Sequence, residues 1–174
     1  TLTVLAGLAA CLSVRPQSDR QLNHRDGIAI VTLGWVTAAL FGTLPYLFSG
    51  VIPDFTNAYF ESISGFTTTG ASTLDMIDTV PEGILLWRSL TQWLGGMGII
   101  VLSIAILPFL GIGGMQLYKA EIPSPVVDKL KPRISETAKT LWKVYLLITL
   151  IQVALLFGGG MPLFDAVCHA FCTM

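Results

Sequence analysis

The chain has 174 residues and a net charge of −1; 53% of the residues are hydrophobic, 12% are charged, and the mean hydropathy is +0.71. A soluble domain typically carries about 25% charged residues, so this composition predicts an integral membrane protein. The near-neutral charge and the lack of any run of like charges argue against a nucleic-acid partner.

Long apolar stretches predict the membrane spans, each of which needs about 20 residues. Residues 2–14 are too short, and we expect them to be the end of a preceding membrane helix. Residues 28–48 and 84–110 are long enough to span, and residues 140–157 lie near the lower limit. The remaining segments are expected to form loops and half-helices.

Basic residues indicate which ends of the spans face the cytoplasm. Every Lys and Arg except Arg88 lies within residues 15–25 or 119–143, and the positive-inside rule places both segments in the cytoplasm. Residues 49–83 carry acidic side chains and no basic one, which suits an outward face that attracts cations. We therefore expect the first complete span to run outward, the second to return and the third to run outward again.

The segment between the first two complete spans has the pattern of a pore loop. Residues 53–65 show the apolar spacing of a helix of about three turns, too short to cross a bilayer. The threonine- and glycine-rich turn that follows suits a cation filter, because successive backbone carbonyls must face a dehydrated ion. Such a turn alone would be weak evidence, so its place between two spans carries the prediction. The predicted ion-binding residues are Thr67, Thr68, Thr69 and Gly70.

The same order of elements recurs near the end of the chain. A shift that lays Asn57 on Asp165 also lays Phe66 on Met174. Identity between the two segments is low, but each has an outward helix, a Gly/Pro turn and a short descending helix. We therefore expect a fragment that holds one complete helix–loop–helix unit and the first part of another.

Three segments carry a specific resemblance to a known family: residues 60–72, 87–98 and 164–171. They resemble the TrkH/KtrB family of potassium uptake subunits. The run Arg25, Asp26 and Gly27 resembles the TrkH branch, which has an extra pair of helices before its first repeat. The resemblance implies membership of a superfamily of potassium transporters built from four linked helix–pore–helix repeats, of which about two are missing from this chain.

The resemblance implies an all-α membrane protein of helix–pore loop–helix units with re-entrant half-helices, truncated after the second pore helix. Within the predicted cytoplasmic loop, Ser124 and Pro125 suit the start of a short helix, which Pro132 is expected to end. The expected parts are the end of a membrane helix with a cytoplasmic connection (1–26), the first helix–pore–helix repeat (27–114), a cytoplasmic loop (115–136) and the start of the second repeat (137–174).

The function implied by the resemblance is potassium transport across a membrane, with no enzymatic activity. The potassium ion is then the transported substrate, and no organic cofactor is expected. The implied partners are membrane lipid, a second copy in a homodimer and a cytoplasmic nucleotide-binding regulatory ring. The implied location is the bacterial or archaeal plasma (inner) membrane. The alternatives are a sodium-coupled or poorly selective cation transporter of the same family and a non-conducting membrane scaffold.

Four further residues are candidates for supporting the filter: Glu61, Ala71, Ser72 and Arg88. Glu61 lies in the middle of the predicted pore helix, where it either buttresses the filter backbone through hydrogen bonds or faces a water-filled vestibule. Arg88 lies near the outer end of the returning helix, where it either reaches lipid headgroups or pairs with an acidic residue. The acidic candidates are Asp75, Asp78 and Glu82.

The aromatic and glycine residues of the returning helix are expected to serve packing. Trp87 and Trp93 belong either to an interfacial aromatic belt or to a packing seam. Gly95, Gly96 and Gly98 permit close approach of another helix, as small residues do in bilayers.

The cysteines lie in apolar surroundings, which favours buried thiols over a disulfide framework. They are Cys11, Cys168 and Cys172. Together with His169, the last two do not have the spacing of a zinc site. We therefore expect them to pack behind the second filter.

Overall fold

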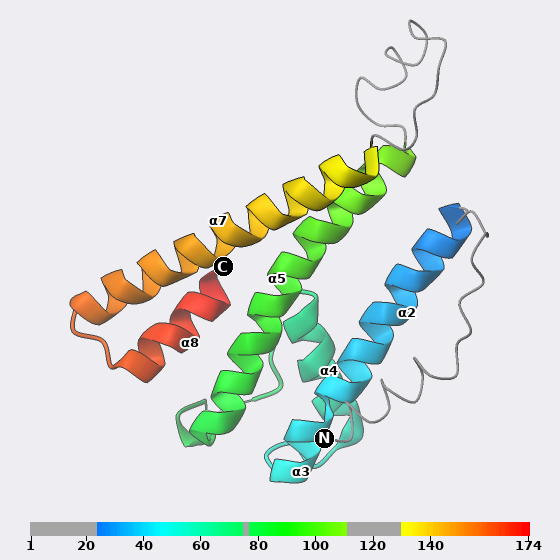
Figure 1. Cartoon of the computed structure of the whole chain (residues 1–174). Helices are drawn as coiled ribbons and strands as arrows, with labels where there is room; N and C mark the ends of the chain where they lie inside the picture. Colours follow the sequence, from blue (N-terminus) through cyan, green and yellow to red (C-terminus); the bar gives the residue numbers. More distant parts are fainter. Residues whose placement is uncertain (1–23, 75–76, 111–129) are drawn as a thin grey trace, which may run out of the picture.

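The computed structural model describes residues 24–74, 77–110 and 130–174 (Figure 1). Within these ranges every regular element is helical, so the predicted all-α class is confirmed. The elements are α2 (His24–Gly42), α3 (Leu44–Ser49), α4 (Phe55–Phe66), a 3₁₀ turn (Ile77–Thr79), α5 (Glu82–Leu110), α7 (Leu130–Gly158) and α8 (Leu163–Thr173).

Three helical stretches of the described chain are long and apolar enough to cross a membrane: Arg25–Ser49, Glu82–Val101 and Glu136–Gly158. They correspond to the three complete spans expected from hydropathy. The first is divided at Thr43 into α2 and α3. Pro45 lies in the first turn of α3, where a missing backbone N–H leaves no helical hydrogen bond unmade.

The third long helix begins earlier than predicted. α7 starts at Leu130, and Pro132 lies in its first turn, so the prediction that Pro132 ends a helix is wrong. Proline is accepted there because the first turn of a helix has no use for its N–H. Residues 124–129 of the predicted short helix lie outside the described residues. The predicted helix fragment at residues 2–14 also lies outside them.

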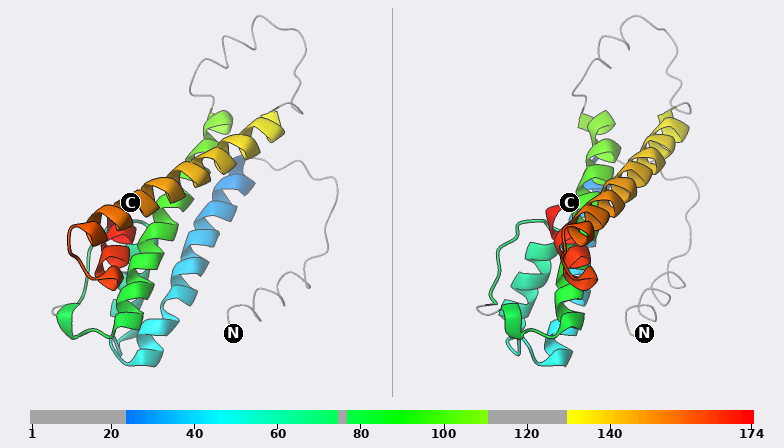
Figure 2. Two further views of the ribbon diagram at one scale, coloured as in Figure 1. Left: turned by 60° about the vertical axis from the view of Figure 1, so that its left-hand side comes forward. Right: turned by 90° about the vertical axis from the view of Figure 1, so that its left-hand side faces the viewer.

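α5 is the central helix of the described part. α4 packs between α2 and α5, and α8 packs between α5 and α7 (Figure 1). The helices α4 and α8 have 12 and 11 residues, well short of the roughly 20 that a span requires. α8 folds back along α7, so the C-terminus of the chain lies against α5 (Figure 2).

The short helix predicted at residues 53–65 is present as α4, and its N-terminus has a clear cause. Asp54 caps the N-terminus, because its carboxylate accepts a hydrogen bond of 2.9 Å from the N–H of Asn57. The buried hydroxyl of Ser62 donates to the carbonyl of Ala39 in α2 at 2.7 Å. This bond holds α4 against the first span.

A small apolar core lies at the end of the bundle where α3, α4 and the start of α5 meet. Trp87 packs against this core, and its Nε1 donates to the carbonyl of Gly42 at 3.0 Å. Trp87 therefore serves packing between spans. The buried members of the core are Tyr46, Ile52, Ala58 and Ile84.

Trp93 joins α5 to α7 and α8. Its ring stacks on Phe171 with centroids 5.1 Å apart, and it contacts Tyr145 and Trp142 with centroids 5.5 and 5.8 Å apart. Its Nε1 donates to Oγ1 of Thr149 at 3.1 Å. Of the two interpretations left open by the sequence, these contacts favour the packing seam.

Trp93→Phe is expected to keep the ring stack and lose the hydrogen bond to Thr149. We expect the lost hydrogen bond to lower stability by about 0.6–1.7 kcal/mol, from the average to the largest value measured for such bonds between membrane helices, in addition to the packing lost with the larger ring. Unfolding in detergent micelles measures the change. The control is the same substitution in a Thr149→Val background, where the loss should be smaller because only the lost ring packing remains; equal losses in both backgrounds would show that the bond contributes nothing.

Candidate cation filter at the end of α4

The predicted filter turn leaves α4 with an unusual backbone. The N–H of Thr68 donates to the carbonyl of Gly65, and the N–H of Thr69 donates to the carbonyl of Ser64, both at 3.0 Å. This pair of bonds is the Schellman ending of a helix, in which the left-handed position usually holds glycine. Here Thr68 holds it, with φ +55°. Left-handed backbone costs an L-residue about 1–2 kcal/mol, and strain of this kind clusters at functional sites.

The hydroxyls of Thr67 and Thr68 bond to nearby backbone. Thr68 Oγ1 donates to the carbonyl of Thr67 at 2.7 Å, so this predicted ligand already accepts one hydrogen bond. Thr67 Oγ1 donates to the carbonyl of Ile63 at 2.8 Å and lies 2.8 Å from Thr69 Oγ1. Gly70 again has positive φ, +74°, with open space where a Cβ would lie. Across the described residues, the carbonyls of Thr68, Thr69 and Gly70 accept no hydrogen bond. These exposed carbonyls could therefore coordinate a cation.

Glu61 holds the segment that returns from the turn. Its carboxylate is 2% exposed and accepts from Ser72 Oγ at 3.0 Å, from the Thr73 N–H at 2.8 Å and from Thr73 Oγ1 at 3.3 Å. One helical turn further along α4, Ser64 Oγ donates to the carbonyl of Ala71 at 2.6 Å. Of the two interpretations of Glu61, its burial and these bonds favour a buttress over a water-filled vestibule.

Arg88 of α5 completes this network. Its Nε donates to Glu61 Oε1 at 2.7 Å, and its side chain is 15% exposed. The expected choice between lipid headgroups and the acids Asp75, Asp78 or Glu82 is corrected, because the salt bridge found in the described part of the chain joins Arg88 to Glu61. The cause is the packing of α4 against α5, which brings together residues 27 positions apart.

The structure therefore brings the predicted filter turn together with every predicted support residue. Sequence reasoning missed Ser64 and Thr73, and it missed the left-handed backbone of Thr68. The helical spacing of Ser64 from Glu61 was a usable signal. For Thr68 there was none, since threonine rarely adopts positive φ.

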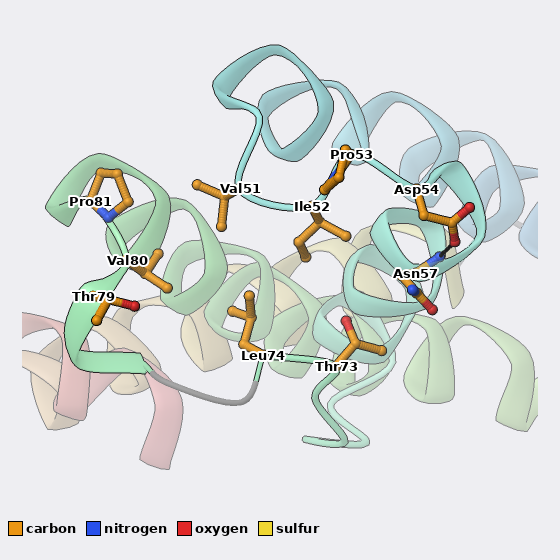
Figure 3. Close-up of a pocket in the computed structure, with 10 residues that line it drawn as sticks. All are labelled: Val51, Ile52, Pro53, Asp54, Asn57, Thr73, Leu74, Thr79, Val80 and Pro81. Carbon is orange, nitrogen blue, oxygen red and sulfur yellow. Dashed lines mark hydrogen bonds between the residues drawn. The ribbon is translucent and has the colours of Figure 1, made fainter.

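A cavity of about 480 Å³ lies beside the network, between the loop that enters α4 and the segment that leaves the turn (Figure 3). Leu74 and Val80 contribute apolar walls, and Thr73 contributes a polar edge. Asp54 also lines it, but this carboxylate already caps α4. The described lining thus offers no set of ligands for an ion.

The cysteines of α8 do not form a metal site with the other residues that the structure describes, where no group of three suitable side chains gathers. Cys168 is half-buried and Cys172 is exposed, so the expected burial is wrong for Cys172. The reason is that α5 covers only one side of it: its Sγ lies 3.3 Å from Ser89 Oγ in α5, and the rest of the residue is left open. Cys11 lies outside the described residues.

The fold and the site define a class: membrane proteins whose half-helix ends in a turn of available carbonyls, as in cation filters. The family model TrkH, described as a cation transport protein, matches residues 3–174. The chain therefore belongs to the TrkH family of cation transport proteins.

Similar proteins agree with this assignment. The chain is 53% identical over 157 residues to the Trk system potassium uptake protein TrkH of Salmonella typhimurium, which covers 88% of this chain and 32% of that protein. It is 41% identical over 160 residues to the Trk system potassium uptake protein TrkG of Escherichia coli, over 91% of this chain and 33% of that protein. The crystal structure of the potassium transporter TrkH from Vibrio parahaemolyticus aligns with a TM-score of 0.79 and 38% identity, over 98% of this chain and 33% of that one. The chain thus spans about a third of the length of these relatives.

Proposed function

We propose that the chain forms one wall of a potassium-selective filter, and the start of a second, in a potassium uptake subunit. The observation that carries this proposal is the turn itself, in which the carbonyls of Thr68, Thr69 and Gly70 are exposed and unbonded within the described part of the chain. The relatives at high identity are named as potassium uptake proteins. Their potassium transport is the activity proposed for the complete subunit, which is a transporter and not an enzyme.

The backbone dihedral angles support a row of carbonyls on one side of the turn. Thr67 has φ −87°, Thr68 has φ +55° and Gly70 has φ +74°. A filter that aims successive carbonyls at one ion needs backbone angles outside the usual helical and extended regions. The positive φ of Thr68 and of Gly70 meets this requirement. A potassium ion that sheds its water needs several such oxygens at once. The other walls would come from the other repeats of the complete subunit.

The hydrogen bonds made by Glu61 and Ser64 support the rigidity that a row of filter carbonyls requires. Glu61 and Ser64 bond the returning segment at Ser72, Thr73 and Ala71. Carbonyls repel one another when no ion lies between them, so a filter needs external bonds to hold its shape. We assign this support to Glu61, Arg88, Ala71 and Ser72, and extend it to Ser64 and Thr73.

The arrangement in the membrane follows from charge and family. The basic connections, residues 15–25 and 119–143, face the cytoplasm, and the filter turn opens outward. The units of the chain are the first repeat at residues 27–114 and the start of the second at 137–174. The complete subunit would form a homodimer in the bacterial or archaeal inner membrane and bind a cytoplasmic nucleotide-binding regulatory ring.

Uptake of rubidium tracer into liposomes that hold the complete subunit tests the function, with potassium and sodium as competitors. We expect uptake that potassium blocks at concentrations where sodium does not. Block by both ions would indicate a poorly selective cation transporter. A folded subunit that takes up no rubidium under any gradient, with its cytoplasmic partner added, would contradict the proposal.

A further inference from the structure

We infer that Gly95 and Gly96 of α5 are positioning residues that set ion selectivity. At these two residues α5 contacts the C-terminal ends of both short helices, α4 and α8. This inference rests on the proposed function and adds to it how the first two filter walls are placed relative to each other. Neither glycine touches the transported ion.

Gly95 lies directly against the last residue before the filter turn. A Cβ at this position would overlap the carbonyl oxygen of Phe66 and would lie 2.7 Å from its carbonyl carbon and 3.0 Å from its Cα. These are backbone atoms, which cannot rotate away as a side chain can. The carbonyl carbon of Phe66 is bonded to the nitrogen of Thr67, the first residue of the turn. Any side chain at position 95 must therefore displace the start of the filter.

Gly96 makes the corresponding contact with the second half-helix. A Cβ there would lie 3.4 Å from the carbonyl oxygen of Met174 and 3.7 Å from its carbonyl carbon. Met174 is the residue that the sequence repeat lays on Phe66. Equivalent ends of α4 and α8 thus contact neighbouring residues of α5, whose directions differ by about 100° around the helix. This agrees with the packing of α4 and α8 against different sides of α5 (Figure 1).

Contact with the backbone of another helix end distinguishes Gly95 and Gly96 from the other glycines of the described helices. At Gly42, Gly65 and Gly98 the atoms nearest to a Cβ belong to side chains. Among the residues that the structure describes, no atom lies within 4 Å of the point that a Cβ of Gly34, in the middle of α2, would occupy, and the same holds for Gly83 in the first turn of α5. Gly34→Ala is therefore a matched control. It makes the same change of residue type and helix propensity in a spanning helix, and its Cβ overlaps no described neighbour.

Selectivity is the property that should respond. Since α5 is one continuous helix through both glycines, a displacement of Phe66 changes the position of the first wall relative to the second. Discrimination between potassium and sodium depends on the number and arrangement of the carbonyls around the ion. A substitution that only destabilised the fold would lower the amount of active subunit and leave this discrimination unchanged.

The test is rubidium uptake by the complete subunit in liposomes, measured with sodium or potassium as competitor. The readout is a ratio: the sodium concentration that halves uptake divided by the potassium concentration that halves uptake. For Gly95→Ala we expect this ratio to fall about tenfold, the size of effect that overpacking by one methyl group produces in an equilibrium. Gly34→Ala should leave the ratio at the wild-type value. A Gly95→Ala subunit with reduced uptake but an unchanged ratio would overturn the inference.

Gly96→Val gives a second measurement, which tests the inference if Gly95→Ala does not yield folded protein on size exclusion. The nearest atom to a Cβ at position 96 is the hydroxyl oxygen of Tyr145, at 2.9 Å, so the substitution is made with Tyr145→Phe, and Tyr145→Phe alone is the reference. We expect a smaller fall in the ratio, about threefold: a Cβ at position 96 would lie at ordinary van der Waals distance from Met174, so only the Cγ atoms of the valine press on it. No fall would overturn the inference. Absence of uptake by the wild type would instead contradict the proposed function.

Discussion

Glu61→Gln is expected to cause a large loss of stability and of ion selectivity. Glu61 is 2% exposed and pairs with Arg88 at 2.7 Å. Removal of one partner from a buried ion pair costs about 3–5 kcal/mol, because the other charge is left unpaired. An amide also has only one acceptor oxygen, whereas Ser72, Thr73 and Arg88 all donate to the carboxylate. The thermal midpoint of the complete subunit in detergent and its rubidium uptake measure the two effects.

Two controls separate the charge pair from the support of the filter. Glu82→Gln makes the same change of charge at an exposed position in the first turn of α5 and should behave as wild type. Arg88→Met combined with Glu61→Gln removes both charges, so it should recover part of the thermal stability while selectivity stays low, since Ser72 and Thr73 still lack their carboxylate. If Glu61→Gln matched Glu82→Gln in both measurements, the network would not support the filter.

Gly70→Asp is expected to abolish transport with little effect on folding. A Cβ at Gly70 meets no atom of the described residues within 4 Å, so the fold can accept the side chain at the cost of left-handed backbone. The new carboxylate would stand beside the carbonyls proposed to bind potassium. One added charge about 4 Å from the ion is worth about 4 kcal/mol at an effective dielectric constant of about 20, which slows release of the cation on the order of a thousandfold. Conduction requires binding that is weak enough for the ion to leave.

Gly50 provides a matched control for this substitution. It has φ +71°, close to the +74° of Gly70, and its Cβ position is equally open. Gly50→Asp therefore imposes the same backbone strain and the same charge in the loop between α3 and α4, away from the filter turn. Rubidium uptake should survive Gly50→Asp and be lost in Gly70→Asp. Equal uptake by the two variants would show that the turn at residues 67–70 does not line the ion path.

Much of the fold could be predicted because it depends on local composition. The three spans follow from apolar stretches whose lengths match a bilayer, and α4 was found from its helical spacing and its short length. The predicted start of α7 is too late, because the sequence pattern predicts a helix end at Pro132. In the structure Pro132 lies in the first turn of α7, where proline is accepted. The filter turn is predicted for a similar local reason, since threonine and glycine at residues 67–70 stand between two spans.

The partners within the site could not be predicted in the same way. Glu61 and Arg88 were both recognised as candidates, but Arg88 was expected to pair with acids of its own neighbourhood or with lipid. The left-handed backbone of Thr68 had no signal in its residue type, because the Schellman bonds to Ser64 and Gly65 impose it.

The sequence by itself determined the membrane class and the three spans, because these depend on hydropathy summed along the chain. The orientation of the spans and the filter role of residues 67–70 stay predictions from charge and short motifs. Only the tertiary structure decided that Glu61 meets Arg88 and that Gly95 lies against Phe66. Each of these contacts depends on the depth at which α4 packs against α5. That depth is set by close packing between surfaces distant in sequence, which no local pattern encodes.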